Sequence, residues 1–97
     1  MNTQRRKRPL FALGQVVATP GALTALEEAE QTPAEFLDRH RIGDWGELGE
    51  EDKQENEFSV KHGLRILSAY TLSTGVKIWI ISEADRSSTC LLLPSDY

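Results

Sequence analysis

The sequence has little of what marks secreted and membrane proteins. It contains one cysteine, Cys90, so an internal disulfide is excluded. Its longest apolar runs, such as residues 78–81, have four residues, whereas a membrane-spanning helix needs about twenty. The basic residues 5–8 are followed by an apolar segment that is too short for a signal peptide. These absences predict a cytoplasmic protein that does not enter the membrane.

Motifs for cofactors and metals are also missing. Neither GxGxxG nor GxxxxGK[ST], the glycine-rich loops that cradle phosphates, occurs in the chain. His40, His62 and Cys90 are not at the spacing of zinc ligands, and a structural zinc site usually needs four ligands. Cys90 lies in an apolar run, which is typical of a buried, unreactive thiol. We therefore expect no cofactor and no bound metal.

The charges are present but unevenly distributed. The net charge is −4, yet residues 1–10 carry four bases and no acid. Residues 27–57 carry twelve acids against three bases, and residues 58–97 carry three acids against four bases. The acidity is therefore confined to one middle block that follows a basic N-terminal arm.

The first half of the chain has helix start signals. The Thr-Pro pairs at residues 19–20 and 32–33 each place a hydroxyl N-cap before a proline at the first helical position. Apolar residues follow at helical spacing, and the second helix includes Phe36 and His40 on its apolar side. A third helix is expected over residues 50–62, with acids in its first turns where the helix dipole favours them.

The second half has the alternation of strands. Residues 64–72 and 76–81 alternate with a period of two around the turn at residues 73–75. Residues 88–93 give a last strand, and residues 11–18 give a short first strand that could join the same sheet. Because both faces of the segment ending at residue 81 are apolar, we expect it to be a central strand.

These elements predict an α+β fold, with two or three N-terminal helices packed on an antiparallel β-meander of three to four strands. Residues 1–9 are expected to be a flexible basic arm, and residues 10–97 a single α+β domain. Trp79 and Ile81 should share one face of the central strand and pack under the helices or a partner.

Three stretches of the chain, "GDWGEL", "ENEFSVKHGLRILSAY" and "GVKIWIISEADRSSTCLLLPSDY", carry a resemblance. They resemble a family of small uncharacterised proteins that are encoded on bacterial plasmids and integrative elements. The resemblance covers most of residues 10–97. It implies a mobile genetic element in a bacterial cytoplasm, and it implies no catalytic residues.

One polar grouping has the residue types of a small ribonuclease-like nuclease. General acid–base logic would make Glu83 the base, His62 the acid, and Arg65 or Arg86 the phosphate clamp. A structural interpretation competes with this one. His62 ends a predicted helix, where it complements the dipole. Glu83, Asp85 and Arg86 lie between two strands, where we expect Asp85 and Arg86 to fix the turn.

The acidic block suggests binding instead, because a dense acidic surface attracts basic partners and raises their association rate. The candidate partner-binding residues are Glu47, Glu50, Glu51, Asp52, Glu55, Glu57, Asp85 and Arg86. The bases of the arm that could contact nucleic acid are Arg5, Arg6, Lys7 and Arg8. The apolar last strands also leave a homodimer open.

The leading hypothesis is a small acidic, non-enzymatic binding protein. It would be an accessory or anti-defence factor of a mobile element that acts on a host macromolecule, with a protein as its expected partner. The basis is charge segregation together with an incomplete set of catalytic residues. The alternative is the nuclease that uses Glu83, His62 and Arg65 or Arg86.

Overall fold

The computed structural model describes residues 8–97 of the protein. Its elements follow the chain in the order β1 (Gln15–Ala18), α1 (Pro20–Ala29), α2 (Pro33–Arg41), α3 (Glu50–His62), β2 (Ile66–Thr71), β3 (Lys77–Ser82), β4 (Ser88–Leu92) and the short 3-10 turn η2 (Pro94–Asp96). The three predicted helices are present. The Thr19 hydroxyl caps α1 by accepting a hydrogen bond from Ala22 N at 3.2 Å, whereas Thr32 makes no such bond to α2.

The strands form one four-stranded sheet in the order β1-β4-β3-β2. The α+β class is therefore confirmed, and β3 is an interior strand as expected. Two details of the predicted fold are wrong. The helices lie in the middle of the chain, after β1, and β1 pairs in parallel with β4, so the sheet is mixed rather than an antiparallel meander. Strand direction was not predictable because apolar alternation is the same in parallel and antiparallel pairs.

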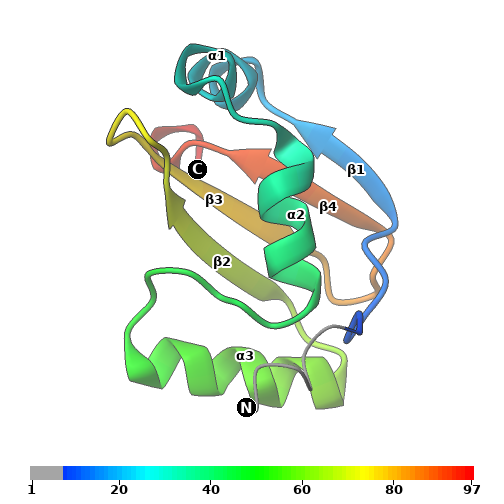
Figure 1. The fold of residues 1–97 in the computed structure, drawn as a ribbon. Helices are drawn as coiled ribbons and strands as arrows, with labels where there is room; N and C mark the ends of the chain where they lie inside the picture. Colours follow the sequence, from blue (N-terminus) through cyan, green and yellow to red (C-terminus); the bar gives the residue numbers. More distant parts are fainter. Residues whose placement is uncertain (1–7) are drawn as a thin grey trace.

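The main core lies between one face of the sheet and the helices α1 and α2. In Figure 1, α2 crosses in front of the sheet and α1 lies at its upper end. Ile78 and Ile80 of β3 are fully buried on this face. The other buried apolar members of the cluster are Ala22, Ala25, Leu26, Ala29, Phe36, Tyr70, Leu72 and Leu91. Because burial of apolar area is the dominant favourable term in folding, this layer holds the helices on the sheet.

The opposite face of the sheet carries Trp79 and Ile81. These two residues were expected under the helices or a partner, but α1 and α2 cover the Ile78 and Ile80 face instead. The ring of Tyr97, the last residue, packs edge-on against Trp79 with the ring centroids 5.8 Å apart. The short turn η2 brings Tyr97 back to this face, so the chain end covers part of the central strand.

The outer edge of β2 is closed by two other segments of the chain. The Asn56 side chain of α3 pairs with the Leu67 backbone, with Nδ2 donating to Leu67 O at 2.7 Å and Oδ1 accepting from Leu67 N at 3.2 Å. Ala69 N donates to Trp45 O at 3.2 Å, and Ala69 O accepts from Glu47 N at 2.7 Å. One amide side chain and one loop therefore satisfy backbone groups that an edge strand leaves unpaired.

Candidate functional site

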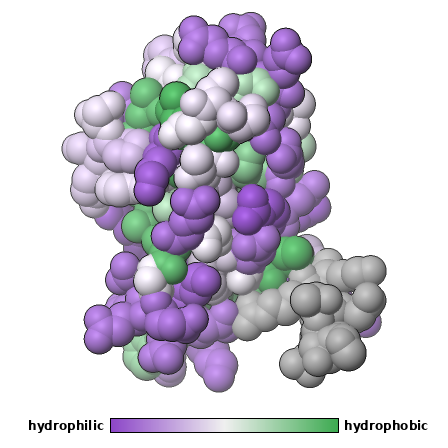
Figure 2. Space-filling model, turned by 60° about the vertical axis from the view of Figure 1, so that its left-hand side comes forward, coloured by the Kyte–Doolittle hydropathy of each residue, from purple (hydrophilic) through white to green (hydrophobic). Residues whose placement is uncertain are grey.

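The outer face of α3 carries most of the predicted acidic surface. Glu50, Glu51, Asp52 and Glu55 are all exposed, and none forms an ion pair or hydrogen bond with another residue of the range 8–97. An open surface hollow is lined by three of these acids, Glu51, Asp52 and Glu55. Gln54 and Phe58 complete its lining. The lower end of the molecule in Figure 2, where α3 lies, is accordingly dominated by hydrophilic side chains.

Two of the predicted acidic residues have structural contacts instead. Glu57 Oε2 accepts a hydrogen bond from the indole Nε1 of Trp45 at 2.9 Å. Glu47 Oε1 accepts one from the Thr71 hydroxyl at 2.6 Å. Both bonds fasten the loop that closes the β2 edge, so the structure divides the acidic set into a free group on α3 and a group that holds the loop.

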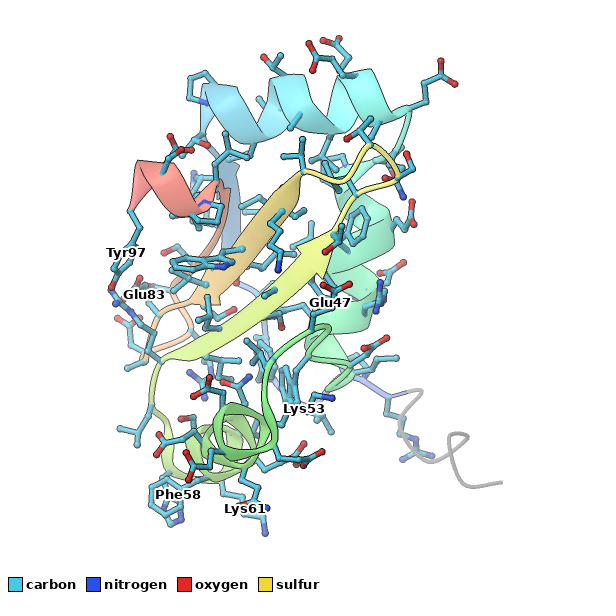
Figure 3. The ribbon with its side chains drawn as sticks, turned by 90° about the vertical axis from the view of Figure 1, so that its left-hand side faces the viewer. Glu47, Lys53, Phe58, Lys61, Glu83 and Tyr97 are labelled. Carbon is cyan, nitrogen blue, oxygen red and sulfur yellow. The ribbon has the colours of Figure 1, made fainter. Side chains whose placement is uncertain are left out.

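Phe58 is the apolar member of this face, and its side chain points away from the sheet (Figure 3). It is 55% exposed, and its ring stacks on the His62 imidazole with the centroids 4.1 Å apart. No surface role was predicted for Phe58. The buried side of α3 is formed by Asn56 and Ser59, which are polar, so the usual apolar spacing did not show which side of this helix faces outward.

Among the residues of the nuclease hypothesis, Glu83 contacts both Arg65 and Arg86, whereas His62 contacts Phe58 instead. Arg65 Nη2 lies 3.4 Å from Glu83 Oε2, and Arg65 Nη1 donates to the Tyr97 hydroxyl at 3.1 Å. His62 stacks on Phe58 and makes no ion pair or hydrogen bond with another residue of the range 8–97. Glu83 and Tyr97 lie near one another on the side of the sheet in Figure 3.

Arg86 is a structural clamp at the connection between β3 and β4. Its Nη1 donates to Leu64 O at 2.6 Å and to Glu83 O at 3.0 Å, and its Nη2 donates to Ser59 O at 2.9 Å. The backbone of Arg86 is left-handed, with φ of 60°. The side chain therefore binds the hairpin to the C-terminal end of α3, through Ser59 O and the following Leu64 O.

Asp85 completes the same turn, because its Oδ1 accepts a hydrogen bond from Ser87 N at 3.0 Å. The ordinary turn that was expected for Asp85 and Arg86 is confirmed by these bonds. The hairpin lies at the C-terminal end of α3, whereas the free carboxylates are in its first turns. Asp85 and Arg86 of the predicted partner-binding set therefore lie at the opposite end of α3 from its exposed carboxylates.

Beneath the helices, a chain of hydrogen bonds connects the sheet to His40, which is fully buried. Thr89 Oγ1 donates to Leu13 O at 2.7 Å, so it accepts from Ser82 Oγ, also at 2.7 Å. Ser82 must then accept from Nε2–H of His40 at 3.0 Å. The His40 Nδ1 atom accepts from the Ser68 hydroxyl at 2.5 Å. The bond directions thus assign the neutral Nε2–H tautomer.

Burial, with a smaller contribution from the positive charge of Arg86, lowers the pKa of His40 to about 3. The ring is also enclosed by Phe11 and Trp45, at centroid distances of 5.2 and 6.0 Å. A substrate has no access to this imidazole, so the network joins strands rather than performing chemistry. Its sequence signal was the place of His40 on the apolar side of the second helix.

Metal and thiol chemistry have no assembled site in the part of the chain that is described. Within residues 8–97, no group of three or more His, Cys, Asp or Glu side chains is placed to hold a metal ion. Burial raises the pKa of the Cys90 thiol, and this disfavours the nucleophilic thiolate.

Comparisons with protein-family models, with curated proteins and with solved structures found no match. The resemblance to proteins of plasmids and integrative elements therefore stays a prediction. Among residues 8–97, no helix is long and apolar enough to cross a membrane. The bases Arg5, Arg6 and Lys7 of the predicted flexible arm lie outside the described residues, and Arg8 is exposed.

Proposed function

We propose that this is a non-enzymatic binding protein that holds a basic segment of a protein partner on the outer face of α3. The observation that carries the proposal is the group of exposed carboxylates without ion-pair partners among residues 8–97, set beside the exposed ring of Phe58. Its members are Glu51, Asp52, Glu55 and Phe58. The role as an accessory or anti-defence factor of a mobile element rests on the resemblance alone.

The two components of this face would act on different steps of binding. Carboxylates steer a basic partner and mainly raise the association rate. An aromatic ring buried by the partner mainly slows dissociation, because aromatic anchors carry much of the binding energy at interfaces. The same negative surface repels the phosphate backbone of nucleic acids, which favours a protein partner.

The nuclease alternative has less support from the contacts. A phosphate clamp needs free guanidinium donors, but Arg86 donates to carbonyl oxygens, and Arg65 is shared between Glu83 and Tyr97. It remains testable with purified protein and labelled RNA and single-stranded DNA. Cleavage that disappears in a His62→Ala variant would contradict the binding-only proposal.

The test begins with affinity capture of a partner from a bacterial lysate and purification of that partner. Association rates are then measured against salt for wild type and for the triple variant Glu51→Gln, Asp52→Asn, Glu55→Gln. We expect the variant to associate roughly tenfold more slowly at low salt, with the difference shrinking as salt screens exposed charges over about 8–10 Å.

A matched control makes the same charge change on another helix. Glu27 and Glu28 of α1 and its C-cap residue Glu30 are exposed, and their replacement by glutamine removes three acids at the end of the molecule opposite Phe58 (Figure 3). This variant should associate nearly as fast as wild type. If both triple variants slow association equally, net charge rather than the α3 face governs binding, and the proposed site is wrong.

A further inference from the structure

The outer edge of β1 is the open counterpart of the closed β2 edge. Gln15 N donates to Ser87 O at 3.0 Å and Thr19 N donates to Leu91 O at 2.9 Å, so these residues face β4. Backbone groups of successive strand residues point to alternate sides. The N–H and C=O groups of Val16 and Ala18 therefore point to the free side, where the sheet ends (Figure 1).

The side chains of β1 include neither of the residue types that commonly keep an edge strand from pairing, charged residues and proline. The strand Gln15–Ala18 has no charge and no proline. Val16 and Val17 are 43% and 44% exposed, and alternation places them on opposite faces of the sheet. An uncharged, apolar edge of this kind is a template for another strand.

The ends of β1 set the length of strand that it can accept. Gly14 before it has a φ of +66°, which turns the chain, and Pro20 after it begins α1. The free edge therefore fits a short uncharged strand of four residues, the length and character of β1 itself. A longer foreign strand would gain few additional backbone hydrogen bonds.

We propose that β1 pairs antiparallel with β1 of a second copy of this chain, in a two-fold dimer that joins two four-stranded sheets into one. The two-fold axis places Val17 opposite the partner's Val17. It places Val16 opposite the partner's Ala18, so that the outward backbone groups of these residues bond reciprocally. The β2 edges stay at the two ends of the joined sheet, so assembly stops at the dimer.

This dimer uses a different surface from the α3 face and responds oppositely to salt. Each chain carries a net charge of −4, so screening should strengthen association between copies. Binding of a basic partner to α3 should weaken in the same series. The two proposals can therefore fail independently.

Sedimentation equilibrium of the full chain over a wide concentration series tests the proposal. As the protein concentration increases, the average molecular mass should rise from the monomer value of 10.9 kDa toward twice that value and no further. The Val17→Lys variant brings two ammonium groups together across the axis and should weaken association roughly tenfold or more. A Val17→Thr variant, which keeps a β-branched uncharged residue, should dimerise like wild type.

A matched control replaces an equally exposed apolar residue away from the edge. Leu23 of α1 is 49% exposed, and Leu23→Lys adds the same charge without touching β1. It should dimerise like wild type. A monomeric mass at every concentration, growth beyond the dimer, or equal association of the Val17→Lys and wild-type proteins would overturn the proposal.

Hydrogen exchange of the wild-type protein gives a second readout that needs no variant. The amides of Val16 and Ala18 should become protected as concentration rises. The amides of Gln15 and Thr19, which already donate within the chain, should change little. Unchanged exchange at Val16 and Ala18 under conditions where the mass doubles would place the interface elsewhere and overturn the proposed pairing.

Discussion

The two edges of the sheet differ in whether their outward backbone groups are hydrogen-bonded. At β2, the Asn56 amide and the loop from Trp45 to Glu47 satisfy the outward backbone groups of Leu67 and Ala69. At β1, the outward groups of Val16 and Ala18 meet no strand in the described chain. Unpaired backbone groups at an edge can template pairing with another strand, so the same sheet has one covered edge and one open edge.

The closed edge depends on the close approach of the loop backbone at Gly46 to the β2 backbone at Ala69, so it should be sensitive to an added side chain at Gly46. A Cβ atom on Gly46 would lie 1.9 Å from Ala69 O, and the φ of Gly46 is +79°. The loop can therefore reach β2 only with glycine at this position. By contrast, β1 pairs only with β4 among the described strands, and its first three residues, Gln15 to Val17, are exposed.

The largest effect on stability is expected from Gly46→Ala, which should displace the loop from the β2 edge. The added methyl group collides with the backbone of β2 and strains the turn. The free energy of unfolding should therefore fall by roughly 3 kcal/mol or more. Chemical denaturation measures this change. Gly49→Ala is the control, since no atom lies within 4 Å of its Cβ position, and it should cost far less. Equal effects would mean that the loop is not held against β2.

The next test removes the amide cover while keeping the loop. Asn56→Leu leaves Leu67 N–H and C=O without partners in a partly buried place, and this should cost about 2–3 kcal/mol. The free energy of unfolding from denaturant titration is the measurement. Gln54→Leu on the exposed side of the same helix should stay within about 0.5 kcal/mol of wild type. A loss at position 54 as large as that at position 56 would contradict the role of the amide.

A third test uses pH to perturb the buried polar network that connects β2, at one edge of the sheet, to the segment before β1, at the other edge. It runs from Ser68 of β2 through His40 to Leu13, which precedes β1. The folded pKa of His40 is about 3, against about 6.5 when unfolded. Between these values only the unfolded chain binds the proton. Stability should therefore fall by about 1.4 kcal/mol for each pH unit below 6.5, and the effect is absent above it.

The pH test requires unfolding free energies at several pH values for wild type, His40→Asn and His62→Gln. The His40→Asn variant should be less stable at neutral pH but should lose part of the slope. The His62→Gln variant replaces an exposed imidazole and should keep the wild-type slope. An unchanged slope in His40→Asn would show that other groups cause the acid sensitivity.

Much of the local structure was predictable because its signals are local. The Thr-Pro pair at residues 19–20 starts α1, the acidic start of α3 and its end at His62 were expected, and alternation marked β2 and β3. The turn role of Asp85 was also predictable, since its bond to Ser87 spans two residues. Such signals need no knowledge of the rest of the fold.

The candidate site was predictable only in part. The acidic first turns of α3 are exposed as a helix rich in charge should be, but Glu47 and Glu57 bond to Thr71 and Trp45, which lie far away in sequence. The exposure of Phe58 was missed because polar Asn56 and Ser59 occupy the buried side of the helix. Each of these outcomes depends on a partner brought in by the fold.

The sequence by itself determined the α+β class, the helix starts, the turns and the acidic composition of α3, because these follow from backbone propensity and from residues a few positions apart. Only the tertiary structure decided that β1 joins β4 in parallel, that α1 and α2 cover the Ile80 face, and that Asn56 closes β2 while β1 stays open. The physical reason is that alternation leaves the direction and order of strands undefined, and backbone groups at an edge are satisfied by whichever distant segment the packed core places beside them.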